Sequence, residues 1–132
     1  MNELNLQQLR FDCRTWKRLL DYMTDEGIHL KNRLSEIVKT CNNNLILEEI
    51  EQLNNYLISE EQLNMLLRNE IAELERLTER AMDDVIQMDK LNAKYKNLSI
   101  GIIAVEERFR NIKTKCKDFF IELLQGQYQM GV

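Results

Sequence analysis

The sequence predicts an all-α protein, a long antiparallel three-helix bundle with coiled-coil-like heptad packing. Along three long stretches, apolar residues recur in alternating steps of three and four, the spacing of a narrow stripe on one side of an α-helix. The chain of 132 residues has no proline and only four glycines, so it lacks the residues that usually separate strands and turns. Three consecutive asparagines, residues 42–44, follow the first stretch and are typical of a turn.

The first helix is expected over residues 6–41. We call its apolar stripe, and the equivalent stripes of the other two helices, a seam. Trp16 should anchor the core because it is the bulkiest residue of this seam. Asparagine side chains compete with a helix for local backbone groups, so the triplet should end the first helix, and Asn44 should cap the next one. The first seam consists of Leu6, Leu9, Cys13, Trp16, Leu20, Met23, Gly27, Leu30, Leu34, Ile37 and Cys41.

The second helix is expected over residues 45–80 and the third over residues 84–124, with Phe109 as a core anchor of the third seam. Asp84 and Gln87 have the spacing of a capping box, which places the intervening turn near residues 80–84 and gives three helices of similar length. A turn at residues 97–101 stays open as the alternative. Residues 1–125 should then form one helical-bundle domain, followed by a frayed tail over residues 126–132.

The chain has a net charge of -4, and its acidic residues are concentrated in the middle, since residues 42–80 contain three arginines and nine glutamates. Antiparallel packing should place basic residues of the neighbouring helices beside these glutamates. A phosphate-binding surface needs cations that are free of carboxylates, so nucleic acid is not expected as a partner. The expected neighbours are Lys113, Lys115 and Lys117 with Glu48, Glu49 and Glu51, and Arg10, Arg14, Lys17 and Arg18 with Glu70, Glu73 and Glu75.

Composition also bears on location and chemistry. Residues 1–10 are polar, and no apolar run approaches the roughly 18 residues that suggest a membrane span, so we expect a cytoplasmic protein without membrane contact. Cys13, Cys41 and Cys116 all fall on seams and should be buried free thiols. No catalytic constellation or phosphate-binding loop is visible, so the chain is expected to be neither an enzyme nor a cofactor carrier.

Glu26 and His29 have the Glu-x-x-His spacing that di-iron helical bundles use, because residues three apart lie on one helix face. A di-iron site needs two such motifs, and His29 is the only histidine of the chain. A solvated surface pair is therefore the expected arrangement. A mononuclear metal held by Glu26, His29 and Glu60 stays open as the alternative.

Small or polar residues interrupt the seams at similar levels along the predicted bundle. Counting from the turns places Gly27 beside Glu60, and a carboxylate at a seam position is unfavourable unless it is paired or hydrated. The expected cause is a bend of the second helix near Ser59 and Gln62 or a hydrated layer, with an ion or small-molecule site as the alternative. We call the following residues the mid-bundle polar layer: Gly27, Glu60, Asn64, Ser99 and Gly101.

Five large apolar residues fall outside the seams at similar levels, and apolar residues that gather on a surface favour a contact surface. The expected function is therefore that of a non-enzymatic helical interaction or scaffold protein, which acts through contacts with an unidentified protein partner or as a homodimer. The alternative is a small-molecule- or metal-binding bundle that uses the mid-bundle polar layer. The five interface candidates are Ile28, Ile58, Met65, Ile100 and Ile103.

Overall fold

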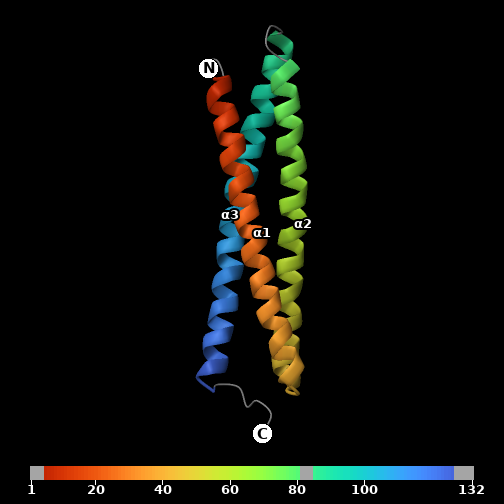
Figure 1. Ribbon diagram of the computed structural model, residues 1–132, viewed down its shortest axis with the longest axis vertical. Coiled ribbons are helices and arrows are strands. Elements are labelled where there is room, and N and C mark those ends of the chain that lie inside the picture. The colour runs from red at the N-terminus through yellow and green to blue at the C-terminus, as the bar shows by residue number, and fades with distance from the viewer. Residues whose placement is uncertain (1–4, 81–84, 127–132) are drawn as a thin grey trace.

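A computed structural model describes residues 5–80 and 85–126, with the side chains of residues 85 and 86 left aside. Three α-helices span Leu6–Thr40 (α1), Asn44–Arg80 (α2) and Val85–Leu124 (α3). Consecutive helices run in opposite directions and pack against each other along a long rod (Figure 1). The predicted fold class, an all-α antiparallel three-helix bundle, is confirmed.

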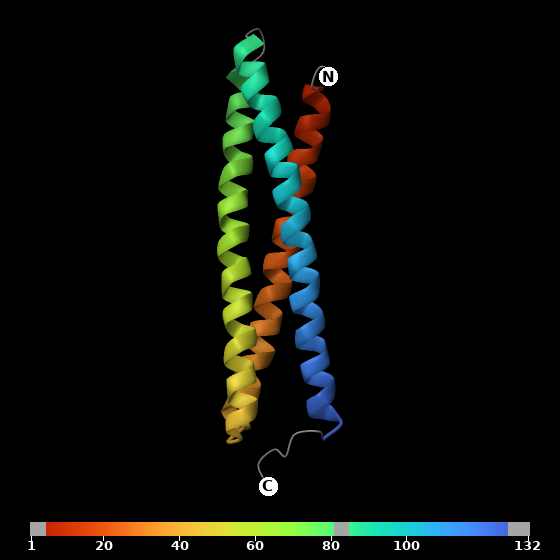
Figure 2. The ribbon, with the colours of Figure 1, turned by 180° about the vertical axis from the view of Figure 1, so that it is seen from behind.

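The middle helix α2 organises the bundle. α1 and α3 contact each other less than either of them contacts α2. Figures 1 and 2 show why: α1 and α3 cross near the middle of the rod, whereas each forms a hairpin with one end of α2. The seam of α2 therefore faces both neighbouring seams, and this arrangement places its polar residues at the centre of the molecule.

The three seams form the core, as predicted. All seam residues named above for α1 are buried or half-buried, and so are Glu60 and Asn64 of α2 and Phe109 of α3. Trp16 is only half-buried, because its indole packs at the seam edge against the Tyr95 ring, with 5.5 Å between centroids. Trp16 therefore contributes to the core without being enclosed by it, unlike Phe109, which is 5% exposed.

Asparagine side chains begin two of the helices. The Asn5 side chain accepts hydrogen bonds from the backbone N–H groups of residues 7 and 8 and caps α1. The Asn43 side chain accepts from the N–H groups of Leu45 and Ile46 at 2.9 and 3.2 Å, so Asn43 caps α2. The prediction of Asn44 as this cap is wrong by one residue, because three adjacent asparagines offer equivalent side chains and only backbone geometry selects between them.

The C-terminal end of α2 and the N-terminal end of α3 agree with the turn predicted near residues 80–84. α2 ends at Arg80 and α3 begins at Val85, so the alternative turn at residues 97–101 is wrong, because that segment lies inside α3. The capping box predicted for Asp84 and Gln87 rests on Asp84, which lies outside the described residues, and so do residues 127–132 of the tail predicted over 126–132. Gly126 follows α3 with a φ of 71°, and its N–H donates to the Leu123 carbonyl at 3.2 Å.

Among the described residues, no helix contains a stretch that is both long and apolar enough to cross a lipid bilayer.

Candidate functional site

The mid-bundle polar layer contains a buried carboxylate. Glu60 is 2% exposed, although it is charged and lies on the α2 seam between apolar residues. Arg108 of α3 places its Nε atom 3.1 Å from Glu60 Oε1, and the guanidinium itself is largely exposed. Burial raises the pKa of the Glu60 carboxyl above its ordinary value, and the nearby Arg108 charge offsets part of this rise. In this ion pair the carboxylate is thus buried, whereas the guanidinium is largely exposed to solvent.

The buried side-chain oxygens of Glu60 and Asn64 lack hydrogen-bond donors among the described residues. Asn64, 5% exposed, donates from Nδ2 to Thr24 Oγ1 of α1 at 3.3 Å. Within the described residues, neither Glu60 oxygen nor Asn64 Oδ1 accepts a hydrogen bond. These three acceptors lie beside a void of about 10 Å³, which Gly27 and Phe109 also line. A void of this size has room for about one water-sized hydrogen-bond donor.

The structure gathers only part of the predicted layer. Gly27, Glu60 and Asn64 line the void, whereas Ser99 and Gly101 do not. Gly101 instead faces Leu67, seven residues along α2 from Glu60, because the α3 residue beside Glu60 is Arg108. α2 continues through Ser59 and Gln62, where a bend was predicted, as one uninterrupted helix.

Gly27 is not required by its surroundings, although its position on a seam suggested a local requirement. A Cβ atom added there would lie 3.9 Å from Phe109 Cε1, which is an ordinary van der Waals separation. We expect Gly27→Ala to raise the free energy of unfolding by about 0.5–1 kcal/mol, because glycine loses more backbone entropy in a helix than alanine does. Urea titration measures the change. A loss of stability would show that the layer needs the open space beside Phe109.

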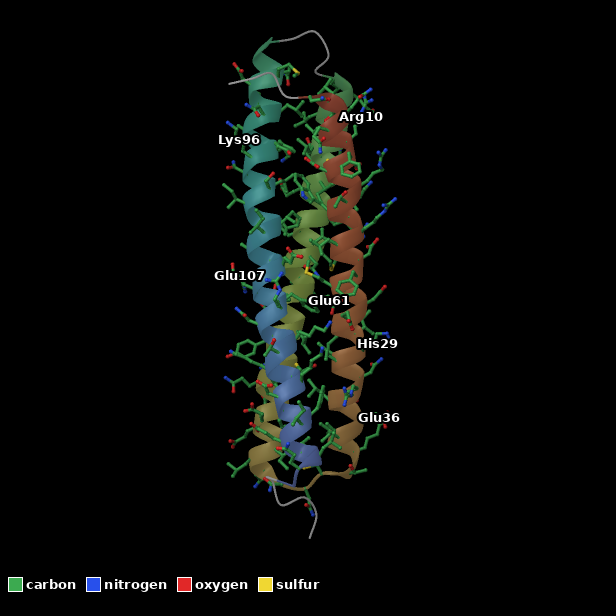
Figure 3. The ribbon with its side chains drawn as sticks, turned by 90° about the vertical axis from the view of Figure 1, so that its left-hand side faces the viewer. Arg10, His29, Glu36, Glu61, Lys96 and Glu107 are labelled. Atoms are coloured by element: carbon green, nitrogen blue, oxygen red, sulfur yellow. The ribbon has the colours of Figure 1, made fainter. Side chains whose placement is uncertain are left out.

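The predicted metal candidates do not converge. Glu26 Oε1 accepts hydrogen bonds from Lys113 Nζ at 2.8 Å and from the Tyr22 hydroxyl at 2.9 Å, and both interactions lower the pKa of the Glu26 carboxyl. His29 lies exposed on α1 (Figure 3), and neither His29 nor Glu26 lines the void beside Glu60. Over the described ranges, no group of three or more histidine, cysteine, aspartate or glutamate side chains is placed to hold a metal ion.

The five interface candidates are all exposed, as the seam assignment predicted. Ile28 on α1 and Ile58 and Met65 on α2 flank two ion pairs that join these helices, Asp21–Arg68 and Lys31–Glu61. These three apolar residues therefore share one side of the rod, and we call this side the α1/α2 face. Ile100 and Ile103 lie on α3, with exposed fractions of 67% and 64%.

The predicted ion pairs form only in part. Lys17 pairs with Glu75 at 3.0 Å as expected, but Lys113 pairs with Glu26 of α1 instead of a glutamate of α2. The reason is geometric: Lys113 lies on the α1-facing side of α3, which a count of levels cannot distinguish from the α2-facing side. Within the described residues, the following charged side chains make no ion pair or hydrogen bond: Arg10, Arg14, Arg18, Glu48 and Glu51.

Several residues of the layer and its surroundings were missed from the sequence. Thr24 and Arg108 each lie beside a seam rather than on it, at positions that face α2. Phe120 is buried beside the α3 seam, with the Arg33 guanidinium 3.9 Å from its ring centroid. The heptad positions next to each seam could have identified these residues. In a three-helix bundle each helix packs against two others, and the positions beside its seam contact one or the other of them.

Comparisons of the chain with protein-family models, with curated proteins and with solved structures find no match. The site geometry is therefore the sole basis for a functional proposal.

Proposed function

We propose that this protein is a non-enzymatic helical interaction or scaffold protein, which acts through its outward helix faces. The observation that carries the proposal is the exposure of large apolar side chains on those faces, above all Ile100 and Ile103 on α3 and Ile28 on the α1/α2 face. Exposed apolar area that gathers on a rigid element favours protein contact. The helical rod holds these side chains at fixed spacing, as a scaffold requires.

The size of the mid-bundle void weighs against the alternative, a small-molecule-binding bundle. Small-molecule sites commonly have volumes of about 300 Å³ or more, whereas the void beside Glu60 measures about 10 Å³. Arg108 already pairs with Glu60, and its positive charge disfavours a second cation there. An excess of acidic residues, with a net charge of -4, likewise makes nucleic acid an unfavourable partner.

Site-specific photo-crosslinking tests the proposal. A photoreactive amino acid replaces Ile28 or Ile103 in the cells that naturally make the protein, and covalent adducts are identified by mass spectrometry. The matched controls are His29 and Glu107, which are exposed on the same helices close to the test positions. We expect protein adducts, including adducts with a second copy, at the isoleucine positions in excess of the controls. Equal yields at test and control positions would contradict the proposal.

A further inference from the structure

The α1/α2 face has a regular layout. Residues seven apart lie on one side of a helix, about 10.5 Å from each other at 1.5 Å per residue. Glu51 lines a groove of about 530 Å³ together with Ser35 and Val38 of α1, which confirms that it belongs to this face. The face thus contains two antiparallel rows with seven-residue spacing: Arg14, Asp21, Ile28 and Ser35 on α1, and Met65, Ile58 and Glu51 on α2.

The Lys31–Glu61 ion pair fixes the relative levels of the two rows. At about 1.5 Å per residue, Met65 lies almost level with Ile28, and Ile58 lies about 9 Å further towards the α1–α2 turn. In the same direction Glu51 is about 20 Å from Ile28, while Arg14 is about 21 Å from Ile28 in the opposite direction. The exposed apolar side chains are thus midway between Arg14 and Glu51, which make no ion pair within residues 5–80 and 85–126.

This spacing matches a two-fold symmetric contact. A two-fold axis through the level of Ile28, perpendicular to the rod, would place Arg14 of one copy at the level of Glu51 of the other, and the reverse. Arg10 and Glu48 extend the two charged ends in the same sense. Because these charges have no ion-pair partner among the described residues, a second copy would supply complementary charge at both ends of one contact.

We propose that the chain forms an antiparallel homodimer through the α1/α2 face, with Ile28 and Met65 at the two-fold axis and Arg14 beside the partner's Glu51. This inference rests on the proposed function and names a second copy as the occupant of this face. Apolar contact at the centre supplies affinity, and the charged ends set the antiparallel orientation. A parallel pair would instead bring like charges together at both ends.

Charge reversal tests the contact in sedimentation equilibrium of the purified full chain. Arg14→Glu and Glu51→Arg should each raise the dimer Kd at least about tenfold, because each converts two attractive contacts into two repulsive ones. The double variant should restore the original Kd, since the exchanged charges meet again across the axis. Matched controls are Lys96→Glu and Glu107→Arg on α3, outside the α1/α2 face (Figure 3), and they should leave the Kd unchanged.

Cysteine crosslinking tests the orientation. In a Cys41→Ser background, whose remaining Cys13 and Cys116 are buried, a short bis-maleimide should join an Arg14→Cys chain to a Glu51→Cys chain. Neither chain should crosslink to itself, because two equivalent Arg14 positions would be about 42 Å apart at 1.5 Å per residue. Self-crosslinking of Arg14→Cys would show a parallel dimer and overturn the proposal.

A monomer at about 100 μM, a concentration at which even a weak specific dimer is populated, would overturn the proposal as well. So would a double charge variant that stays dissociated while its thermal melt matches the parent. None of these results would contradict the proposed function, which fails only when photo-crosslinking at Ile28 and Ile103 gives no adducts above the controls. The two hypotheses are therefore separable.

Discussion

Phe109→Ala is expected to lower the free energy of unfolding by about 3–5 kcal/mol, the usual loss when a buried aromatic ring is truncated in a core. Phe109 is 5% exposed on the α3 seam, and its ring approaches Gly27 where α1 and α3 cross. Alanine would leave a cavity at the level that already contains the void beside Glu60. Neighbouring side chains of three different helices would have to move to fill it. Urea titration followed by circular dichroism measures the loss.

Phe11→Ala is the matched control for this substitution. Phe11 lies on α1 with 54% of its surface exposed, so its truncation removes little buried area, and the expected change is within about 0.5 kcal/mol. A loss below about 1 kcal/mol for Phe109→Ala would contradict the assignment of Phe109 to the core.

Glu60→Leu is expected to raise the free energy of unfolding by about 1–4 kcal/mol. Leucine completes the α2 seam and removes a desolvated carboxylate whose oxygens accept no hydrogen bond within the described chain. The partner Arg108 is largely exposed, so its guanidinium regains hydration and is not left as a buried unpaired charge. Leucine, which has a similar volume and favours helices, therefore adds buried apolar surface and leaves no buried polar group of Arg108 without a partner.

The gain should depend on pH. Burial raises the pKa of Glu60 in the folded state, so the folded chain holds its proton at pH values where the unfolded chain has lost it. Glu60 therefore reduces stability above its folded pKa, and this penalty disappears below the unfolded value of about 4.3. The advantage of Glu60→Leu over the parent should be full at pH values above the raised pKa of Glu60 and should shrink as the pH falls through that pKa.

Glu61→Leu provides the control at the next residue. Glu61 forms a half-exposed ion pair with Lys31, and loss of such a pair should change stability by less than about 1 kcal/mol. If Glu60→Leu instead destabilises the protein by more than about 2 kcal/mol, the carboxylate is held by specific donors and the layer is a connected polar network.

The periodicity of apolar residues was sufficient to predict the three helices and their seams. Alternating steps of three and four reflect the helical repeat itself, so the burial of positions such as Leu20, Leu74 and Phe119 follows from local sequence. The cap at Asn43 was missed by one residue because the neighbouring asparagines are chemically identical. The capping-box spacing of Asp84 and Gln87 and the similar helix lengths placed the second turn near residues 80–84, and α2 ends at Arg80 and α3 begins at Val85.

The polar contacts could be predicted only in part. A level count from the turns brought Gly27 and Glu60 together but wrongly added Gly101, because α2 and α3 pair at a different level, with Arg108 beside Glu60 and Gly101 beside Leu67. Long side chains add a second uncertainty. Lys113 and Arg108 have long, flexible side chains, so their partners depend on which neighbour faces each side of α3.

The central place of α2 has a consequence for folding kinetics. Most contacts between helices join elements that are consecutive in the chain, so the bundle consists of two hairpins that share α2. Topologies with such short sequence separation between contacts fold on timescales of about microseconds to milliseconds. During synthesis, α1 and α2 leave the ribosome before α3, so both helices of the α1/α2 face are complete while the third is still being made. Assembly of two chains through that face would not have to wait for α3, because α3 packs against the opposite side of the hairpin.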